Sequence, residues 1–265
     1  MNTWILIYHA LDCAAEPVAL DNAADLSVVV GADDFQRQLQ YLRDLEMPVV
    51  SLEDVLDPSC DLPNRDHVVL TFDDGHRSNW SLGLPRLVEA GVTATFYVVA
   101  GWVDKDPEYL TSPQLREMAD RNMLIGSHTM THRFLPQLSR EQLHRELADS
   151  RARLEDILGR PVVDLAIPGG HTNRAVLEES RQCGYRSVAT CKVGLYRRSG
   201  DPFRLPRVEI RRELSQQGFC QTFNTTKLRQ LQAIELAKAC LRKTCGLSAY
   251  TRLRRLAHRY LVLNR

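Results

Sequence analysis

The chain has 265 residues, of which 44% are hydrophobic and 25% charged, and its formal net charge is +1. These values exclude a mostly disordered chain, and the near-zero charge argues against a protein that binds nucleic acid over its whole surface. The charge is nevertheless divided unevenly. Residues 1–185 carry 16 Lys and Arg against 29 Asp and Glu, whereas residues 186–265 carry 18 against 4. We therefore expect an acidic body followed by a basic extension.

The N-terminal sequence is typical of a buried strand rather than an export signal, because Tyr8 and His9 interrupt its apolar run and no basic segment precedes it. No apolar stretch is long enough to cross a bilayer. The seven cysteines lack Cys-x-x-Cys spacing and are expected to be reduced thiols. The sequence thus predicts a cytoplasmic location, and it leaves open a peripheral contact with the inner face of the membrane.

Apolar, β-branched runs alternate with helix-period segments along the first 215 or so residues. We expect strands at residues 4–11, 49–52, 67–72, 92–100, 123–127, 162–167, 187–190 and 207–210. Between most of these runs, helix signals predict helices at 33–46 and 77–90, and helices that begin at Ser112-Pro113, at the capping box of Ser139 and Gln142, and at Thr172 or Asn173.

This alternation of strands and helices predicts parallel strands joined by right-handed crossovers. The number of units favours an α/β fold of the distorted or incomplete (β/α) barrel type over an open doubly wound sheet. The sequence contains no glycine-rich nucleotide-binding loop, which an open doubly wound sheet of the nucleotide-binding type would have.

The pattern changes after residue 220. Residues 221–265 contain ten Lys and Arg and a single acid, Glu235, with leucines at roughly helical spacing. We therefore expect two domains, at 1–220 and 221–265, the second a basic amphipathic helical extension. It could pack on the acidic body, contact anionic lipids or dock a partner protein. No recognition motif supports nucleic-acid binding.

Two adjacent carboxylates, Asp73 and Asp74, end an apolar strand and precede Gly75. Catalytic groups of α/β folds lie at the carboxyl ends of strands. Two neighbouring carboxylates repel each other unless a cation or a proton separates their roles, so one can bind a metal while the other acts as a base. The alternative is an ordinary Asp-Asp-Gly turn.

A second strand is followed by His128 and His132. Histidines four residues apart can share one metal ion. Together with Asp74 they make a His-His-Asp set, which leaves a coordination position open for water, as in catalytic zinc sites. The same ligands accept Co²⁺ and Ni²⁺. A third strand, ending in Pro168-Gly-Gly, is a weaker signal for close approach of backbone to a ligand.

The order of these motifs resembles the polysaccharide deacetylases, also called the NodB-homology domain or carbohydrate esterase family 4. The resemblance covers roughly residues 1–215 and implies a distorted (β/α) barrel with one divalent metal, usually zinc. It further implies that Asp73 is the general base, that Asp74, His128 and His132 are metal ligands, and that an acetyl group is removed from an amino sugar.

The chain departs from the family pattern in two places. Ala166 stands where the third motif has an arginine, and the late motif that supplies the general acid is not recognisable. Arg207 could replace the missing charge by pairing with Asp73, or it could be a surface residue. His171 is the best-placed substitute acid, or a loop histidine facing solvent. His9, at the end of the first strand, could face the pocket or lie in the core.

The sequence therefore predicts a metal-dependent deacetylase that acts on an acetylated amino sugar, as a poly- or oligosaccharide or its lipid- or nucleotide-linked precursor, in cell-surface or exopolysaccharide synthesis. Two alternatives remain open. One is a catalytically impaired carbohydrate-binding or scaffold protein, suggested by the missing arginine and histidine. The other is an amidase or deformylase with the same metal centre.

Overall fold

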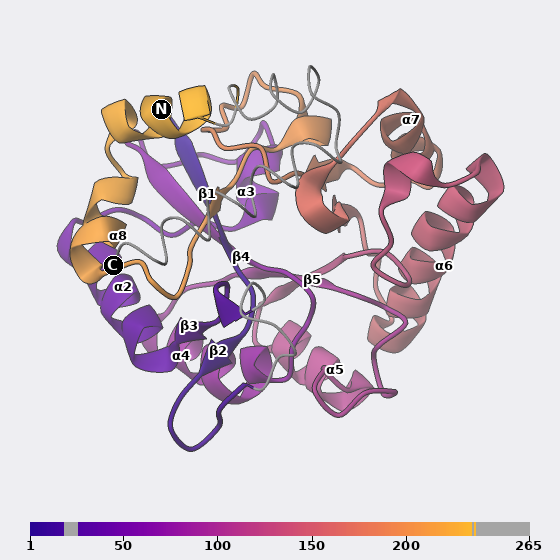
Figure 1. The fold of residues 1–265 in the computed structure, drawn as a ribbon, viewed down its shortest axis with the longest axis horizontal. Helices are drawn as coiled ribbons and strands as arrows, with labels where there is room; N and C mark the ends of the chain where they lie inside the picture. The colour runs from indigo at the N-terminus through magenta and orange to yellow at the C-terminus, as the bar shows by residue number, and fades with distance from the viewer. Residues whose placement is uncertain (19–25, 235, 237–265) are drawn as a thin grey trace, which may run out of the picture. The chain divides into compact units, whose positions relative to one another are not determined.

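The computed structural model describes residues 1–18, 26–234 and 236. Contacts within the chain divide it into two units, residues 1–220 and 221–265, and each is described by itself. The described residues of the first unit contain a seven-stranded parallel sheet in the order β8-β7-β6-β5-β4-β1-β9, and a two-stranded sheet of β2 and β3 (Figure 1). The strands are β1 Thr3–Tyr8, β2 Leu11–Asp12, β3 Val30–Gly31, β4 His67–Phe72, β5 Thr95–Val98, β6 Leu124–Ser127, β7 Asp164–Ala166, β8 Ser187–Ala189 and β9 Val208–Glu209.

One segment, residues 205–209, contains the edge strand β9 and also contacts the opposite edge of the large sheet. Leu205 pairs in parallel with Ala189 of β8, and β9 pairs in parallel with β1. The segment therefore joins the two edges of the curled sheet and closes a distorted barrel. The predicted (β/α) barrel architecture is confirmed.

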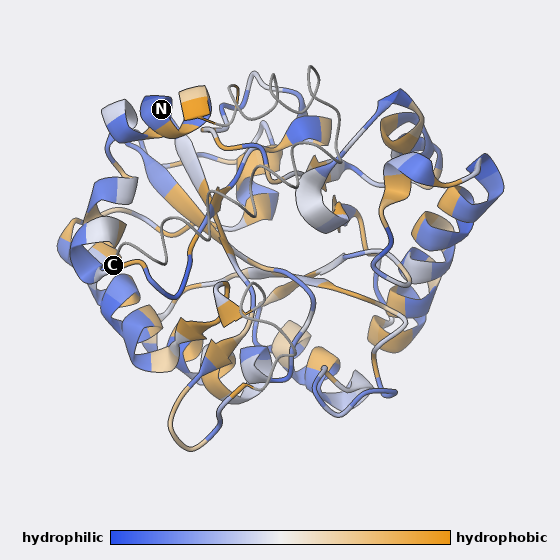
Figure 2. Ribbon diagram, viewed as in Figure 1, coloured by the Kyte–Doolittle hydropathy of each residue, from blue (hydrophilic) through white to orange (hydrophobic). Residues whose placement is uncertain are grey.

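Helices surround the strands (Figure 1). Figure 2 shows hydrophilic residues along α2 and α6 with hydrophobic residues between them. Leu165 of β7 points outward and packs with Leu147 and Val176 of the helical layer, whereas its neighbour Ala166 belongs to the cluster inside the barrel. This alternation follows from the two-residue period of a strand. The helices are α2 Ala32–Asp44, α3 Leu52–Leu56, α4 Leu84–Ala90, α5 Ser112–Asp120, α6 Arg140–Leu158, α7 Arg174–Gln182 and α8 Gln216–Thr222.

The strand expected at residues 49–52 is wrong. Val49 makes a single bridge to β4, and the chain then forms α3. Ser51 caps this helix, because its hydroxyl accepts a hydrogen bond from the backbone N–H of Asp54 at 2.9 Å. The buried face of α3 packs against the barrel interior. In sequence, a short apolar run around a capping serine has the same pattern as a short strand.

The predicted helix starts are confirmed at Ser139 and Asn173, which are the N-caps of α6 and α7. Two others differ by one or two positions. Asp33 lies inside the first turn of α2 rather than at its cap, and Thr111 rather than Ser112 precedes α5. The helix expected at 77–90 consists of a π-helical turn, Asn79–Gly83, followed by α4.

In the second unit, residues 225–234 and 236 are helical. Residues 237–265, which carry most of the predicted basic extension, lie outside the described residues. None of the helices among the described residues is long and apolar enough to cross a membrane.

Candidate active site

The carboxyl ends of several barrel strands open into one cavity of about 420 Å³. Most of the residues that line it come directly after strands or from the loops that follow them, and Glu209 lies at the end of β9. The lining residues are His9, Ala10, Val28, Val29, Asp73, Asp74, His76, Trp102, Tyr109, His128, His132, Gly169, Cys191 and Glu209. Parallel strands end at the same face of a barrel, so residues far apart in sequence meet here. Four of the six predicted site residues, Asp73, Asp74, His128 and His132, are among them.

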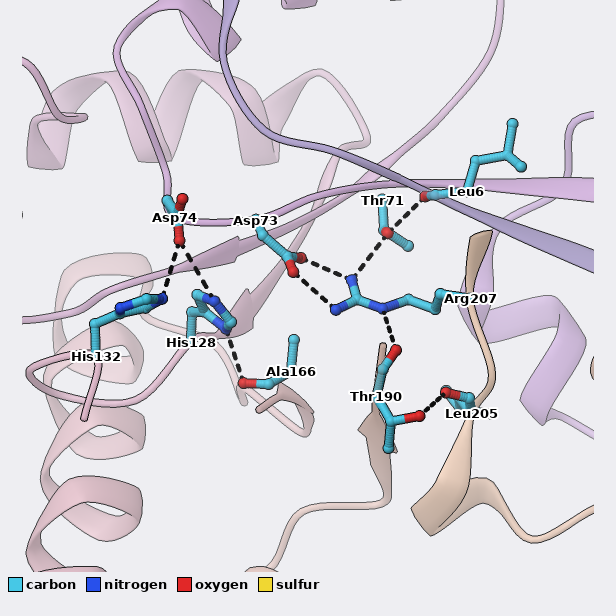
Figure 3. Close-up of polar contacts among 10 residues, drawn as sticks. All are labelled: Leu6, Thr71, Asp73, Asp74, His128, His132, Ala166, Thr190, Leu205 and Arg207. Atoms are coloured by element: carbon cyan, nitrogen blue, oxygen red, sulfur yellow. Dashed lines mark hydrogen bonds and ion pairs between the residues drawn. The ribbon is translucent and has the colours of Figure 1, made fainter. Parts of the chain in front are cut away.

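Asp73 and Arg207 form a buried, two-pronged ion pair (Figure 3). Both guanidinium nitrogens Nη1 and Nη2 donate to the Asp73 carboxylate oxygens at 2.7 Å. The arginine side chain is 0% exposed and the aspartate side chain 3%. Arg207 therefore pairs with Asp73 instead of lying at the surface, because it comes just before β9 in the segment that joins the sheet edges.

Further contacts hold the guanidinium of Arg207 in place. Its Nε donates to the Thr190 carbonyl at 3.0 Å, and its Nη1 also donates to the hydroxyl of Thr71 at 3.1 Å. The centroid of the Tyr97 ring lies 5.4 Å from the guanidinium carbon Cζ of Arg207. Burial alone would raise the pKa of Asp73, but the charge and hydrogen bonds of Arg207, together with the nearby histidines His128 and His9, outweigh it and keep that pKa below its usual range. Asp73 is thus an ionised, oriented carboxylate.

The other aspartate, Asp74, lies beside two histidines. Its Oδ1 is 3.4 Å from Nε2 of His128 and 3.4 Å from Nε2 of His132 (Figure 3). Nitrogen and oxygen ligands held about 2 Å from a zinc ion at tetrahedral angles are roughly 3.3 Å apart. One ligand atom from each of the three residues lies within 4.8 Å of the others. These residues therefore fit a divalent cation, with cavity space left beside it.

A hydrogen bond to the backbone fixes the orientation of the His128 ring. Its Nδ1 donates to the carbonyl of Ala166 at 2.8 Å, which leaves Nε2 as the atom with a free lone pair facing Asp74. Burial lowers the pKa of His128, so the ring is neutral at neutral pH. The alanine that stands in place of the arginine of the third motif thus contributes a carbonyl that orients a ligand.

The backbone around Asp74 and His132 is strained. Asp74, Thr129 and His132 have φ angles of 73°, 70° and 59°, in the left-handed region that non-glycine residues rarely adopt. Each such residue costs about 1–3 kcal/mol and persists only when its surroundings impose it. Strain of this kind clusters at functional sites.

Glu146 of α6 holds the strained loop between the two histidines. Its carboxylate accepts hydrogen bonds from the backbone N–H groups of Met130 at 3.0 Å and Thr131 at 2.9 Å, and from the Thr131 hydroxyl. This residue was not among those predicted from the sequence. A signal was present, because Glu146 stands on the apolar stripe of its helix beside Leu143 and Leu147, where a charged side chain needs a buried partner.

Aromatic rings form one wall of the cavity. The centroid of the Trp102 ring lies 4.3 Å from the centroid of the Tyr109 ring and 5.5 Å from that of the His132 ring. His76 lies in the same region, with its Nδ1 2.8 Å from the Ser78 hydroxyl. Tryptophan and tyrosine faces are suited to packing against a ring-shaped ligand.

The predicted acid, His171, and a second histidine, His9, are placed differently. His171 is exposed, its ring lies 5.3 Å from that of Phe134, and it is not among the residues that line the cavity. His9 does line the cavity. Its Nδ1 is buried and has no hydrogen-bond partner within the described part of the chain.

Comparisons with known proteins agree with this geometry. The family model described as polysaccharide deacetylase matches residues 62–188, which include Asp73, Asp74, His128 and His132. The residues that this model matches belong to the polysaccharide deacetylase family. The arginine that pairs with Asp73, Arg207, lies beyond the matched range.

Three similar proteins extend this result. YxkH of Bacillus subtilis, whose name places it among the polysaccharide deacetylases, is 26% identical over 81% of this chain and 74% of its own length. A peptidoglycan-N-acetylglucosamine deacetylase of Bacillus cereus is 31% identical over 48% of this chain and 58% of its own length. The structure of the Streptococcus pyogenes deacetylase PplD in complex with acetate is 27% identical, with a TM-score of 0.75 over 84% of this chain and 99% of that one.

Proposed function

We propose that this chain is a metal-dependent hydrolase that removes an acetyl group from an N-acetylated amino sugar. One observation carries the proposal. Two adjacent aspartates at the end of β4 face one cavity with different partners, Asp73 with a guanidinium and Asp74 with two histidines. The cavity volume is within the range of small-molecule sites. The names of the similar proteins from B. cereus and S. pyogenes support deacetylation.

Asp74, His128 and His132 would hold the cation, which when bound lowers the pKa of a water molecule and polarises the acetyl carbonyl. Asp73 takes the proton of the attacking water, because its carboxylate is ionised and points into the same cavity. Arg207 keeps that carboxylate charged and fixed. The aromatic wall of Trp102 and Tyr109 packs against the sugar ring.

The departing amine needs a proton. His9 is better placed to donate it than His171, because it lines the cavity and has a buried nitrogen without a partner among the described residues. His171 lies on the exposed loop after β7. We therefore assign the acid role to His9 and treat His171 as the alternative.

Zinc is the expected metal, and the substrate class is a cell-surface or exopolysaccharide amino sugar or its lipid- or nucleotide-linked precursor. A cytoplasmic location, and a membrane or protein contact through residues 221–265, remain predictions from the sequence.

Acetate release from N-acetylglucosamine oligomers tests the proposal. The protein is stripped with a chelator and then reloaded with Zn²⁺, Co²⁺ or Ni²⁺. We expect release to stop on stripping and to return on reloading. Oligomer binding by the zinc-loaded protein without acetate release would instead support a scaffold role. Formate release from formylated sugars without acetate release would support a deformylase.

A further inference from the structure

A second group of metal-binding side chains lies in the helical layer, apart from the cavity. It consists of His144 of α6, Glu179 of α7 and Cys183, the residue that ends α7. One ligand atom from each lies within 4.8 Å of the others. Glu179 and Cys183 are four residues apart and share one face of α7, while His144 approaches from the neighbouring helix. None of the three is among the residues that line the cavity.

Glu179 is a buried carboxylate whose ion-pair partners are His144 and, at a longer distance, Arg140. Its side chain is only 7% exposed, and it stands on the buried stripe of α7 with Val176 and Ser180. The His144 ring nitrogen Nδ1 lies 2.7 Å from Oε1, but the nearest arginine atom, Nε of Arg140, is 3.9 Å from Oε2. Burying a carboxylate is costly unless a positive charge offsets the lost hydration. A bound cation would supply that charge.

The same three residue types could in principle make a cysteine nucleophile, but the contacts argue against it. The distance from Cys183 Sγ to His144 Nδ1 is 3.9 Å, too long for an activating proton transfer. Burial and then the Glu179 carboxylate raise the pKa of Cys183 to about 11, which is the opposite of activation. A cation beside the sulfur would reverse the effect of the carboxylate and favour the thiolate.

We propose that His144, Glu179 and Cys183 bind one Zn²⁺ that links α6 to α7. Zinc ligands at tetrahedral angles are roughly 3.3–3.6 Å apart, the longer value applying to sulfur. Cys183 Sγ lies 3.8 Å from Glu179 Oε1 and 3.9 Å from His144 Nδ1, close to this spacing. His144 must move outward to widen its 2.7 Å contact with Glu179, and its exposed side chain permits that.

The ligand types favour zinc over magnesium or calcium, because thiolate and imidazole are poor ligands for those hard cations. Solvent beside His144 leaves room for a water as fourth ligand. The bound ion would also stiffen α6 near Glu146, the carboxylate that holds the loop between His128 and His132. The site would therefore stabilise the helix that supports the catalytic cavity.

Cobalt spectroscopy distinguishes this site from the set of Asp74, His128 and His132, which contains no sulfur. The experiment uses the full chain with Asp74→Asn, which weakens the cavity site. We expect Co²⁺ to produce thiolate-to-cobalt charge-transfer absorption, and Zn²⁺ to displace it. Cys183→Ser in this background should abolish the absorption, and His144→Ala should weaken cobalt binding at least about 10-fold.

The matched control is Cys60→Ser in the same background. Cys60 is also a partly buried free cysteine, but it does not belong to the cluster of His144, Glu179 and Cys183. This substitution should leave the charge-transfer absorption unchanged. Cys191 also lines the cavity, and Cys191→Ser in the same background should likewise leave the absorption unchanged.

Two results would overturn the proposal. One is the absence of charge-transfer absorption when Co²⁺ is added to the Asp74→Asn protein. The other is absorption that survives Cys183→Ser, since the thiolate would then be a different cysteine. Neither readout depends on acetate release, so the proposal stands or falls separately from the proposed deacetylase function.

Discussion

Asp73 and Asp74 are neighbours in the chain and opposites in their surroundings. Asp73 is buried, and its carboxylate accepts hydrogen bonds from Nη1 and Nη2 of Arg207. Asp74 has a side chain that is 29% exposed, a left-handed backbone and two imidazole nitrogens at 3.4 Å. The first carboxylate has its positive partner within the protein. The second is arranged with two histidines around a position that a cation can take.

This difference in surroundings allows two identical side chains to do different things, one accepting a proton and the other binding a cation. Two like charges at adjacent positions oppose each other's ionisation unless each has its own counter-charge. Against the effect of burial, the charge and hydrogen bonds of Arg207 help to keep the pKa of Asp73 low, and the hydrogen bond from His132 helps to keep the pKa of Asp74 low. One carboxylate can then remove a proton while the other binds metal.

Removing Arg207 should have the largest effect on the difference between Asp73 and Asp74. Arg207→Ala leaves Asp73 buried without a counter-charge, and breaking a buried ion pair in this way costs about 3–5 kcal/mol in free energy of unfolding. Acetate release should fall as well, because Asp73 would become protonated. Chemical denaturation and an acetate assay measure the two losses.

A double variant separates the lost pair from a general packing defect. Arg207→Leu with Asp73→Asn removes the charge from both partners, and should recover part of the stability lost by Arg207→Leu alone. A double variant as unstable as the single one would show that the ion pair is not what Arg207 contributes.

Glu146→Gln should act on the part of the site that contains Asp74, His128 and His132. The amide oxygen can replace only one of the two carboxylate oxygens that accept hydrogen bonds from Met130 and Thr131. The strained loop should then hold His132 less firmly. We expect metal affinity to fall about 10- to 100-fold, as is usual for residues that orient metal ligands. Calorimetric titration of the stripped protein with Zn²⁺ measures it.

Glu141→Gln is the matched control for this change, because Glu141 is an exposed residue of the same helix that pairs with Arg145. It should leave zinc affinity unchanged. Equal losses in the two variants would mean that the charge of α6, rather than the loop contact, matters for metal binding.

Thr71→Val should give the smallest effect, on the Asp73 side alone. It removes the hydroxyl that accepts from Arg207 and donates to the Leu6 carbonyl at 2.7 Å. We expect a loss of about 1 kcal/mol in stability. Thr95 is opposite Thr71 on the adjacent strand, and its buried hydroxyl has no partner within the described residues. Thr95→Val should therefore be neutral or stabilising, and a reversed order would contradict the role of the Thr71 contact.

The clustering of Asp74, His128 and His132 can be predicted from the sequence, because these residues follow two strands in short, local motifs. The barrel is also predictable, since most strands are continuous apolar runs. Residues 49–52 do not follow the prediction, because periodicity cannot separate a short buried helix from a strand. Strands β2 and β3, of two residues each, are too short to leave a pattern.

Long-range contacts set the limit of prediction. Arg207 lies 134 positions from Asp73, and only closure of the barrel brings them together. Glu146 and Glu179 carry a common signal, a charge on the buried face of a helix, that indicates a partner without identifying it. His9 and His171 both follow strands, so strand ends alone could not show which one faces the cavity.

The central claim is that Asp73 moves the proton and Asp74 binds the metal. It is tested most directly by comparing Asp73→Asn with Asp74→Asn in a Cys183→Ser background, where metal can be counted at the cavity alone. We predict that Asp73→Asn keeps its zinc and loses about 10²- to 10⁴-fold in acetate release, whereas Asp74→Asn loses the zinc. Full activity in Asp73→Asn, or equal loss of zinc in both variants, would contradict the account.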